Sequence, residues 1–261
     1  MNFLPHHWTL LPSQIPPTLS RFNSLSFVSY NVTRDLDINT ATWTDGKVLN
    51  WKVRGSLLLS HILHFDPSLV LLQSLDHAED WWIPSFQTKG YSTFFSPFGG
   101  EKIGGLLVCW KREEFLAMST TTVDLDEVAG FINHPTLKAR CKEGEIGQIL
   151  LLQPRKESGN LLPCPLLVGN LLLSTKEGYD DVRVEQTKFF LKILQSQMST
   201  LHCPLILGGS LSSTPASGVY EIITTGKVPL LYGPPPAPGK AKVEILSRAS
   251  VKVKVLKIKK N

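Results

Sequence analysis

A succession of short strand-like runs, each bounded by turn residues, constrains the fold of this chain more than any other feature of its sequence. Runs of this length that are rich in Val, Ile, Leu and aromatic residues are typical of β-strands with at least one buried face. They occupy residues 25–32, 68–75, 91–97, 103–111, 147–154, 164–174 and 203–210. Two longer segments, 50–65 and 180–198, repeat apolar residues at helical spacing instead. The sequence therefore predicts a mixed α/β domain, with a further short helix that ends at Gly226.

The order of these segments restricts how the strands can pair. Strands and helices alternate in the first third of the chain, whereas the middle is mostly strand. The runs 91–97 and 103–111 predict a pair of strands joined through the Gly-rich turn at Gly99-Gly100. This mixture fits two β-sheets packed face to face with helices on the outside, and it fits a uniformly parallel sheet poorly.

The net charge of +5 is concentrated at one end of the chain. From Gly239 to Asn261 eight basic residues accompany the single acid Glu244, so this segment carries +7 and the remaining body carries −2. The body is therefore not a basic RNA-binding surface by composition. Hydrophobic residues make up 42% of the sequence, which is enough for a globular core.

Changes in composition indicate the domain boundaries. We predict an N-terminal extension at 1–24, a globular domain at 25–233, a Pro-rich linker at 234–239 and a basic tail at 240–261. The tail alternates lysine with apolar residues, and two interpretations stay open. It is either an edge strand with a solvated lysine face, a common protection against aggregation, or a flexible arm that touches phosphate or a protein partner.

The chain lacks the charge and apolar pattern of a secretory signal, and its apolar stretches are too short or too interrupted to span a bilayer. We expect a cytoplasmic protein without membrane association. The mitochondrion is the alternative, because the first 34 residues contain no acid. The four cysteines lack metal-ligand spacing, so buried thiols are expected rather than disulfides or zinc ligands: Cys109, Cys141, Cys164 and Cys203.

Several blocks of sequence are similar to known motifs, in the same order. "SFVSYN" ends in S-Y-N, "LNWKVR" resembles L-x-W-x-x-R, and "DPSLVLLQSLD" resembles D-P-D-I-L-C-L-Q-E-V-D. "KIGGLLVCWKREEF" resembles K-x-D-G-x-A-x-x-x-K-x-x-x-F, and "LLVGNLLLS" resembles V-A-N-T-H-L. "CPLILGGSLSSTPAS" resembles C-P-x-I-L-C-G-D-F-N-S-x-P-x-S. These motifs belong to the endonuclease/exonuclease/phosphatase superfamily, and the chain most resembles its deadenylase branch, the Angel proteins above all.

The resemblance runs from about Leu25 to Gly233 and implies a four-layer α-β-β-α sandwich. After Gly239 the chain has no counterpart of the S-D-H segment that ends the family's domain. The fold is therefore expected to be missing or divergent in its last strands. A truncated or alternatively spliced product is one explanation that stays open.

The resemblance also implies where a catalytic site would lie, and the residues there have changed. The family's metal-binding glutamate corresponds to Ser74, its T-H-L histidine to Leu172, and its G-D-x-N carboxylate and amide to Ser210 and Ser212. The D-G aspartate corresponds to Gly104. Hydroxyl groups are neutral at physiological pH, and without a general base they are neither strong metal ligands nor activated nucleophiles.

Some family residues remain. Asn31 and Asn170 match the two asparagine motifs and are candidates for a residual phosphate contact, although Asn31 at a strand end equally fits a purely structural role. Asp76 is the candidate metal ligand if the site has been rearranged. Trp81-Trp82 and the aromatic residues of 91–97 are expected in the core or its rim rather than stacked on bases. Arg183 and Gln186 on the long helix are expected to brace the fold.

Two functions from different classes follow. The first is a catalytically degenerate Angel-like protein with a binding or scaffold role in RNA metabolism. It would hold a protein partner of the RNA-processing machinery, make weak RNA contact through the basic tail and need no cofactor. The alternative is a metal-dependent RNA nuclease, deadenylase or RNA-terminal phosphatase whose rearranged site uses Asp76, Asn31 and Asn170 with Mg²⁺.

Overall fold

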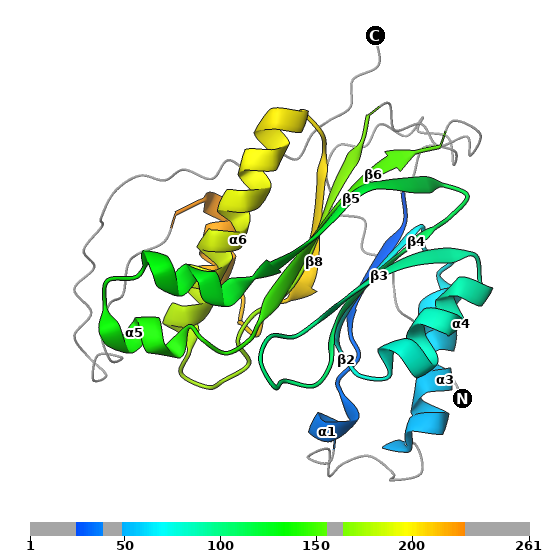
Figure 1. Ribbon diagram of the computed structural model, residues 1–261, viewed down its shortest axis with the longest axis horizontal. Coiled ribbons are helices and arrows are strands. Elements are labelled where there is room, and N and C mark those ends of the chain that lie inside the picture. The colour runs from blue at the N-terminus through cyan, green and yellow to red at the C-terminus, as the bar shows by residue number, and fades with distance from the viewer. Residues whose placement is uncertain (1–24, 39–48, 156–163, 228–261) are drawn as a thin grey trace.

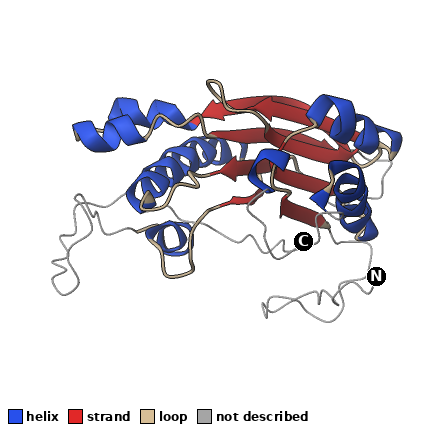
Figure 2. Ribbon diagram, turned by 90° about the horizontal axis from the view of Figure 1, so that it is seen from below, coloured by secondary structure: helices blue, strands red, loops and turns tan. Residues whose placement is uncertain are grey.

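The computed structural model describes residues 25–38, 49–155 and 164–227. Its strands form two four-stranded sheets, in the orders β1-β2-β4-β3 and β5-β6-β7-β8. Helices cover the outer faces of the two sheets, so the layers run α-β-β-α (Figures 1 and 2). The predicted linker and basic tail, and the N-terminal extension, lie outside the described residues.

The first sheet and its helices come from the first part of the chain. The strands are β1 (Phe27–Asn31), β2 (Leu69–Leu75), β3 (Tyr91–Pro97) and β4 (Gly105–Lys111). The helices are α1 (Asp35–Ile38), α3 (Trp51–His64), the π-helical turn η2 (Ala78–Trp82) and α4 (Ile83–Thr88). Helix α3 begins where the Asn50 carboxamide accepts a hydrogen bond from the backbone N–H of Lys52 (3.1 Å).

The second sheet follows in the chain. Its strands are β5 (Phe115–Asp124), β6 (Ile146–Pro154), β7 (Leu166–Leu172) and β8 (Leu205–Ser210). The 3₁₀-helix η3 (Leu125–Phe131), α5 (Pro135–Arg140), α6 (Asp180–Leu201) and α7 (Gly218–Thr225) accompany it. Helix α6 carries two acids in its first turn, where their negative charge interacts favourably with the helix dipole. Helix α7 is capped by Gly226, whose φ is 71°.

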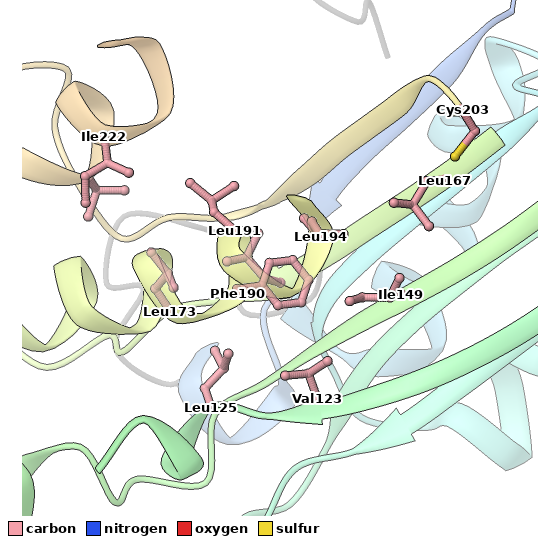
Figure 3. Close-up of a cluster of buried hydrophobic side chains, with 12 residues drawn as sticks. Val123, Leu125, Ile149, Leu167, Leu173, Phe190, Leu191, Leu194, Cys203 and Ile222 are labelled. Atoms are coloured by element: carbon pink, nitrogen blue, oxygen red, sulfur yellow. The ribbon is translucent and has the colours of Figure 1, made fainter. Parts of the chain in front are cut away.

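Central strands are buried on both faces, which explains their continuous apolar sequences. On β2, Val70 and Leu72 pack toward α3 and α4, whereas Leu69 and Leu71 join the layer between the two sheets. The second sheet packs its other face on α6 and α7, around Phe190, Leu191 and Leu194 (Figure 3). A Cβ at residue 147 would lie 2.3 Å from the Phe190 ring, so glycine at this point of β6 lets the helix approach the sheet.

The predicted strands and long helices are confirmed, with ends shifted by a few residues. The ten-residue strand β5 was not predicted, because its Ser and Thr side chains are mostly exposed and give no apolar pattern. The short helices α4 and α5 were also missed. Three cysteines are buried and Cys164 is half-buried, all as free thiols. Among the described residues, no helix combines the length and apolar character needed to cross a membrane.

A buried network of amide side chains joins the two sheets. Gln73 on β2 donates from Nε2 to the Asn170 carboxamide oxygen on β7 (2.8 Å). Asn170 donates in turn to the Leu72 carbonyl and to Gln148 Oε1 on β6, both at 3.1 Å. Gln148 donates to the Phe94 and Leu106 carbonyls of the first sheet (3.0 and 3.2 Å). Because a buried polar group without a partner is costly, the network fixes how the sheets are placed relative to each other.

Replacing Asn170 by leucine tests the weight of this network. Asn170→Leu should lower the free energy of unfolding by about 2–4 kcal/mol, because it leaves several buried partners without their hydrogen bonds. Denaturant titration measures the change. Gln195→Leu, which alters an exposed amide on α6, is the control and should change stability by less than about 0.5 kcal/mol. Equal effects of the two variants would contradict a structural role for the network.

Candidate active site

The positions singled out from the motifs gather at one edge of the sandwich. Strands β1 and β2 run parallel, with Asn31 opposite Gln73, and β7 and β8 run parallel, with Leu172 opposite Ser210. The carboxyl ends of each pair therefore lie together. The Asn31 amide donates to Ser210 Oγ across the two sheets (3.0 Å), so both edges meet at one place.

The backbone at this edge is held in uncommon conformations. Ser74 has φ of 53° and Ser212 has φ of 48°, in the left-handed region that residues other than glycine rarely adopt. The pairing of β2 with β4 shifts register between Leu72 and Leu75, so Ser74 lies in a bulge. Strained backbone of this kind persists only where the surrounding structure imposes it. Here the residues in the strained positions are serines.

The polar side chains at this edge bond to one another and to the backbone. Asn31 accepts a hydrogen bond from the Thr33 N–H (3.1 Å), and the Ser212 hydroxyl donates to the Leu173 carbonyl (3.4 Å). Ser29 Oγ accepts from both Gln73 Nε2 (3.2 Å) and the Gly209 N–H (3.1 Å). None of the hydroxyl groups at Ser74, Ser210 and Ser212 is ionised near neutral pH, so this edge contains neither a carboxylate nor a base at those positions.

Leu172 takes part in hydrophobic packing. Its side chain is 2% exposed and lies in a cluster with Phe98, Leu106 and Ile146. The cluster closes the space between the two sheets where β7 ends. A leucine here can neither donate a hydrogen bond nor carry charge, and its packing stabilises the edge instead.

Gly104 has no room for a side chain. Its φ is 100°, and a Cβ would lie 2.6 Å from the Leu75 carbonyl oxygen and 2.9 Å from Cδ of Arg34. Arg34 crosses this position to donate to the Ile103 carbonyl (2.7 Å), and its guanidinium group pairs with Asp37. An acidic side chain therefore cannot be restored at residue 104 without moving both the Leu75 backbone and Arg34.

Asn170 lies deeper than the edge. It is fully buried, and its carboxamide is engaged by the inter-sheet network. A phosphate contact by Asn170 stays a prediction, as does one by the exposed Asn31. Arg183 and Gln186 do brace the fold: Arg183 donates to the carbonyls of Ser174 and Lys176, and Gln186 accepts from the Ser174 N–H. Trp82 is fully buried, as expected for a core residue.

Sequence analysis missed several charged residues beside this edge. Lys102 pairs with the buried Glu145 (3.0 Å), at the wall of a cavity of about 510 Å³ that lies between the loops around residues 100, 143 and 175. Arg34 was missed too. The signal that could have found it is its place three residues after the asparagine of the S-Y-N motif.

Asp76 belongs to a second polar group, a few residues beyond Ser74. Its Oδ2 accepts the Asp35 N–H (2.6 Å), and His77 and Asp35 lie next to it. Burial lowers the pKa of His77, but the hydrogen bond to Asp80 and the charges of Asp76, Asp80 and Asp35 raise it more, so the pKa lies above its usual value.

Comparisons with known proteins point to one family. No protein-family profile matches the chain. Protein angel homolog 1 of Rattus norvegicus is 30% identical over 189 residues, which is 69% of this chain and 27% of that protein. The chain thus spans about a quarter of the length of this relative. The crystal structure of ANGEL2, described as a 2′,3′-cyclic phosphatase in complex with adenosine-2′,3′-vanadate, matches with a TM-score of 0.68 and 25% identity.

The ANGEL2 match covers 85% of this chain and 65% of that one. The human nocturnin catalytic domain with bound sulfate matches with a TM-score of 0.61 and 21% identity, over 76% of this chain and 67% of that one. At this identity the second match shows a shared fold.

The crowding at Gly104 gives a testable expectation. Gly104→Ala should lower the free energy of unfolding by about 1–3 kcal/mol, because the new Cβ meets a carbonyl oxygen in a strained conformation. Gly130→Ala is the matched control, since a Cβ there meets nothing within 4 Å, and it should change stability by less than about 1 kcal/mol. Thermal and denaturant unfolding measure both. A neutral Gly104→Ala variant would show that the backbone around Leu75 and the Arg34 side chain both adjust readily.

Proposed function

Because the chain belongs to the endonuclease/exonuclease/phosphatase superfamily, in the deadenylase branch close to the Angel proteins, we propose that it is a catalytically degenerate Angel-like protein. Its role in this proposal is binding or scaffolding in RNA metabolism rather than hydrolysis. The observation that carries the proposal is the edge where β1, β2, β7 and β8 end. At this edge the amide of Asn31 lies beside the hydroxyl of Ser210, and leucine replaces the family's histidine.

The chemistry of this edge supports the proposal. Hydrolysis of a phosphate ester by a divalent cation needs hard anionic oxygen ligands, which hold the ion and offset the charge that develops on the phosphoryl oxygens. Ser74 and Ser210 offer neutral oxygens, and Leu172 offers none. This donor set does not fit a Mg²⁺ ion. The packing around Leu172 and Gly104 also does not accommodate the family's polar side chains at these two positions without rearrangement.

Exposed apolar residues near the edge support a binding role. Leu36 and Ile103 are 61% and 60% exposed. Arg34 bonds to the Ile103 carbonyl, so the segments that carry the two residues lie side by side. Apolar side chains held out on an ordered rim suit contact with another protein. In this proposal the partner is a protein of the RNA-processing machinery.

The test compares the native protein with a variant that restores the family's residues, Ser74→Glu/Leu172→His/Ser210→Asp/Ser212→Asn. Calorimetric titration with Mg²⁺ measures ion uptake. Phosphate release from RNA with a 2′,3′-cyclic phosphate end and shortening of poly(A) measure hydrolysis. The native protein should take up no Mg²⁺ at concentrations up to about 1 mM, which is the dissociation constant of the weakest carboxylate sites for divalent cations. It should also hydrolyse neither RNA. The restored variant should bind Mg²⁺ measurably.

Leu172→His places a polar ring in an apolar cluster, so the single variant Ser74→Glu is measured as well, and circular dichroism checks that each variant is folded. Hydrolysis by the native protein that is lost in Asp76→Asn would overturn the proposal. That result would favour the alternative function, an RNA nuclease or RNA-terminal phosphatase with a rearranged site.

A second part of the proposal concerns the basic tail, which lies outside the described residues. We expect it to give weak, salt-sensitive RNA binding, with a dissociation constant of about 10⁻⁴ to 10⁻⁶ M. Replacing four of its lysines by glutamine, at Lys252, Lys254, Lys257 and Lys259, should weaken binding. The slope of log K against log[salt] should fall by up to about 3, because each lost contact with single-stranded RNA releases about 0.7 fewer ions. Fluorescence anisotropy in a salt series measures this slope, and an unchanged slope would exclude the tail.

A further inference from the structure

Two carboxylates and an imidazole converge just beyond the degenerate edge. Asp35 begins α1, and Asp76 and His77 connect β2 to η2. One ligand atom from each residue lies within 4.8 Å of the other two. Asp76 lies two residues beyond Ser74 and matches the last acid of the L-Q-E-V-D motif, whereas Asp35 and His77 lie outside the positions compared with the family.

The His77 ring is held in one orientation. Its Nδ1 lies 2.8 Å from Asp80 Oδ2, which fixes the proton on that nitrogen. Its Nε2 lies 3.5 Å from Asp35 Oδ2 and thus faces the two carboxylates. The ring also stacks on Trp51, with centroids 4.4 Å apart and planes 11° from parallel. Around protein-bound metal ions, a ligating histidine usually donates a hydrogen bond to a carboxylate from one ring nitrogen and binds the metal through the other.

In each of the two carboxylates, one oxygen is held by a polar partner and the other is available to bind an ion. Asp35 Oδ1 pairs with the Arg54 guanidinium group, which is itself anchored on the carbonyls of Val32 and Thr33 (both 2.8 Å). Asp76 accepts the Asp35 N–H through Oδ2. The free oxygens and His77 Nε2 therefore come from side chains whose positions are already determined, which lowers the entropic cost of binding an ion.

The charge around the group favours a cation. Asp35, Asp76 and Asp80 bring three negative charges, and Arg54 brings one positive charge. A bound cation offsets this excess of negative charge.

We propose that Asp35, Asp76 and His77 bind a divalent transition-metal ion of the Zn²⁺ class, with Asp80 as the residue that positions the imidazole. Imidazole nitrogen selects Zn²⁺, Co²⁺ or Ni²⁺ over Mg²⁺ and Ca²⁺, which prefer all-oxygen sites. In a tetrahedral site, bonds of about 2.0–2.2 Å place two ligand atoms about 3.4 Å apart, so ligand atoms that now lie within 4.8 Å of one another close by up to about 1.4 Å around the ion. The inference goes beyond the proposed function and does not depend on it.

The first experiment is calorimetric titration of the full-length, chelator-treated protein with ZnCl₂ at pH 7.5, repeated with CoCl₂ for its visible absorption bands. The native protein should take up one ion per chain at this group. His77→Gln should remove that uptake, and Asp80→Asn should weaken it about 10- to 100-fold, as loss of a carboxylate partner to a ligating histidine does. His64→Gln, which alters an exposed histidine on α3, is the matched control and should bind like the native protein.

A second measurement on the native protein guards against unfolded variants. The pH titration of the His77 ring, followed by NMR, should disappear in the presence of Zn²⁺ because the metal replaces the proton at Nε2. If His77 titrates unchanged with Zn²⁺, or if His77→Gln binds Zn²⁺ as the native protein does, the group is an ion pair of protonated His77 and the proposal is overturned. Neither measurement uses Mg²⁺ or RNA, so its failure is distinguishable from failure of the proposed function.

Discussion

The hydrogen bonds between Gln73, Asn170 and Gln148 are the interaction on which the rest of this structure depends. The residue clusters buried between the two sheets are apolar, and apolar packing tolerates small sliding movements. Polar contacts at the strand ends, such as the hydrogen bond from the Gly209 N–H to Ser29 Oγ, add to the network. Amide groups with several specific partners do not, because each shift leaves a buried donor or acceptor unpaired. The network therefore fixes the distance between β2 and β7. It thereby also brings Asn31, at the end of β1, within hydrogen-bond distance of Ser210 at the end of β8.

A consequence is that the shape of the edge does not depend on its chemistry. Ser74 and Ser212 keep left-handed backbone conformations that cost energy and that no serine requires. The bulge in β2 and the turn after β8 are imposed by the strands that lead into them, and those strands are held by the network and the core. Side chains at the tips could thus change without loss of the fold. At Leu172 and Gly104 the changes have gone further, since apolar packing and Arg34 now fill the space.

The sequence predicts the elements whose environment is uniform along their length. Strands β2 and β7 are buried on both faces, so most of their residues are apolar and identify them plainly, apart from the few polar residues Gln73, Ser74 and Asn170. Strand β5 lies at an edge of its sheet with exposed Ser and Thr, and no local pattern distinguishes it from a loop. The site divides in the same way. The order of the motifs predicts that Asn31, Ser74 and Ser210 meet, whereas the contact of Arg34 with Gly104 depends on how a loop crosses a strand end and has no signature in the sequence.

Negative charge is unevenly distributed around the edge. At the edge itself the positions taken from the family's motifs hold no carboxylate, but a few residues away Asp35, Asp76 and Asp80 surround His77. Arg54 offsets only part of that charge, and it is buried and held by two backbone carbonyls, so it cannot move to offset more. Uncompensated carboxylates repel one another and destabilise the folded state unless a cation joins them. Among the described residues, the proposed cation site therefore lies between α1 and η2, beside the edge rather than within it. Asp76 and His77 directly follow β2, so the end of that strand positions a ligand held there together with α1 and Trp51.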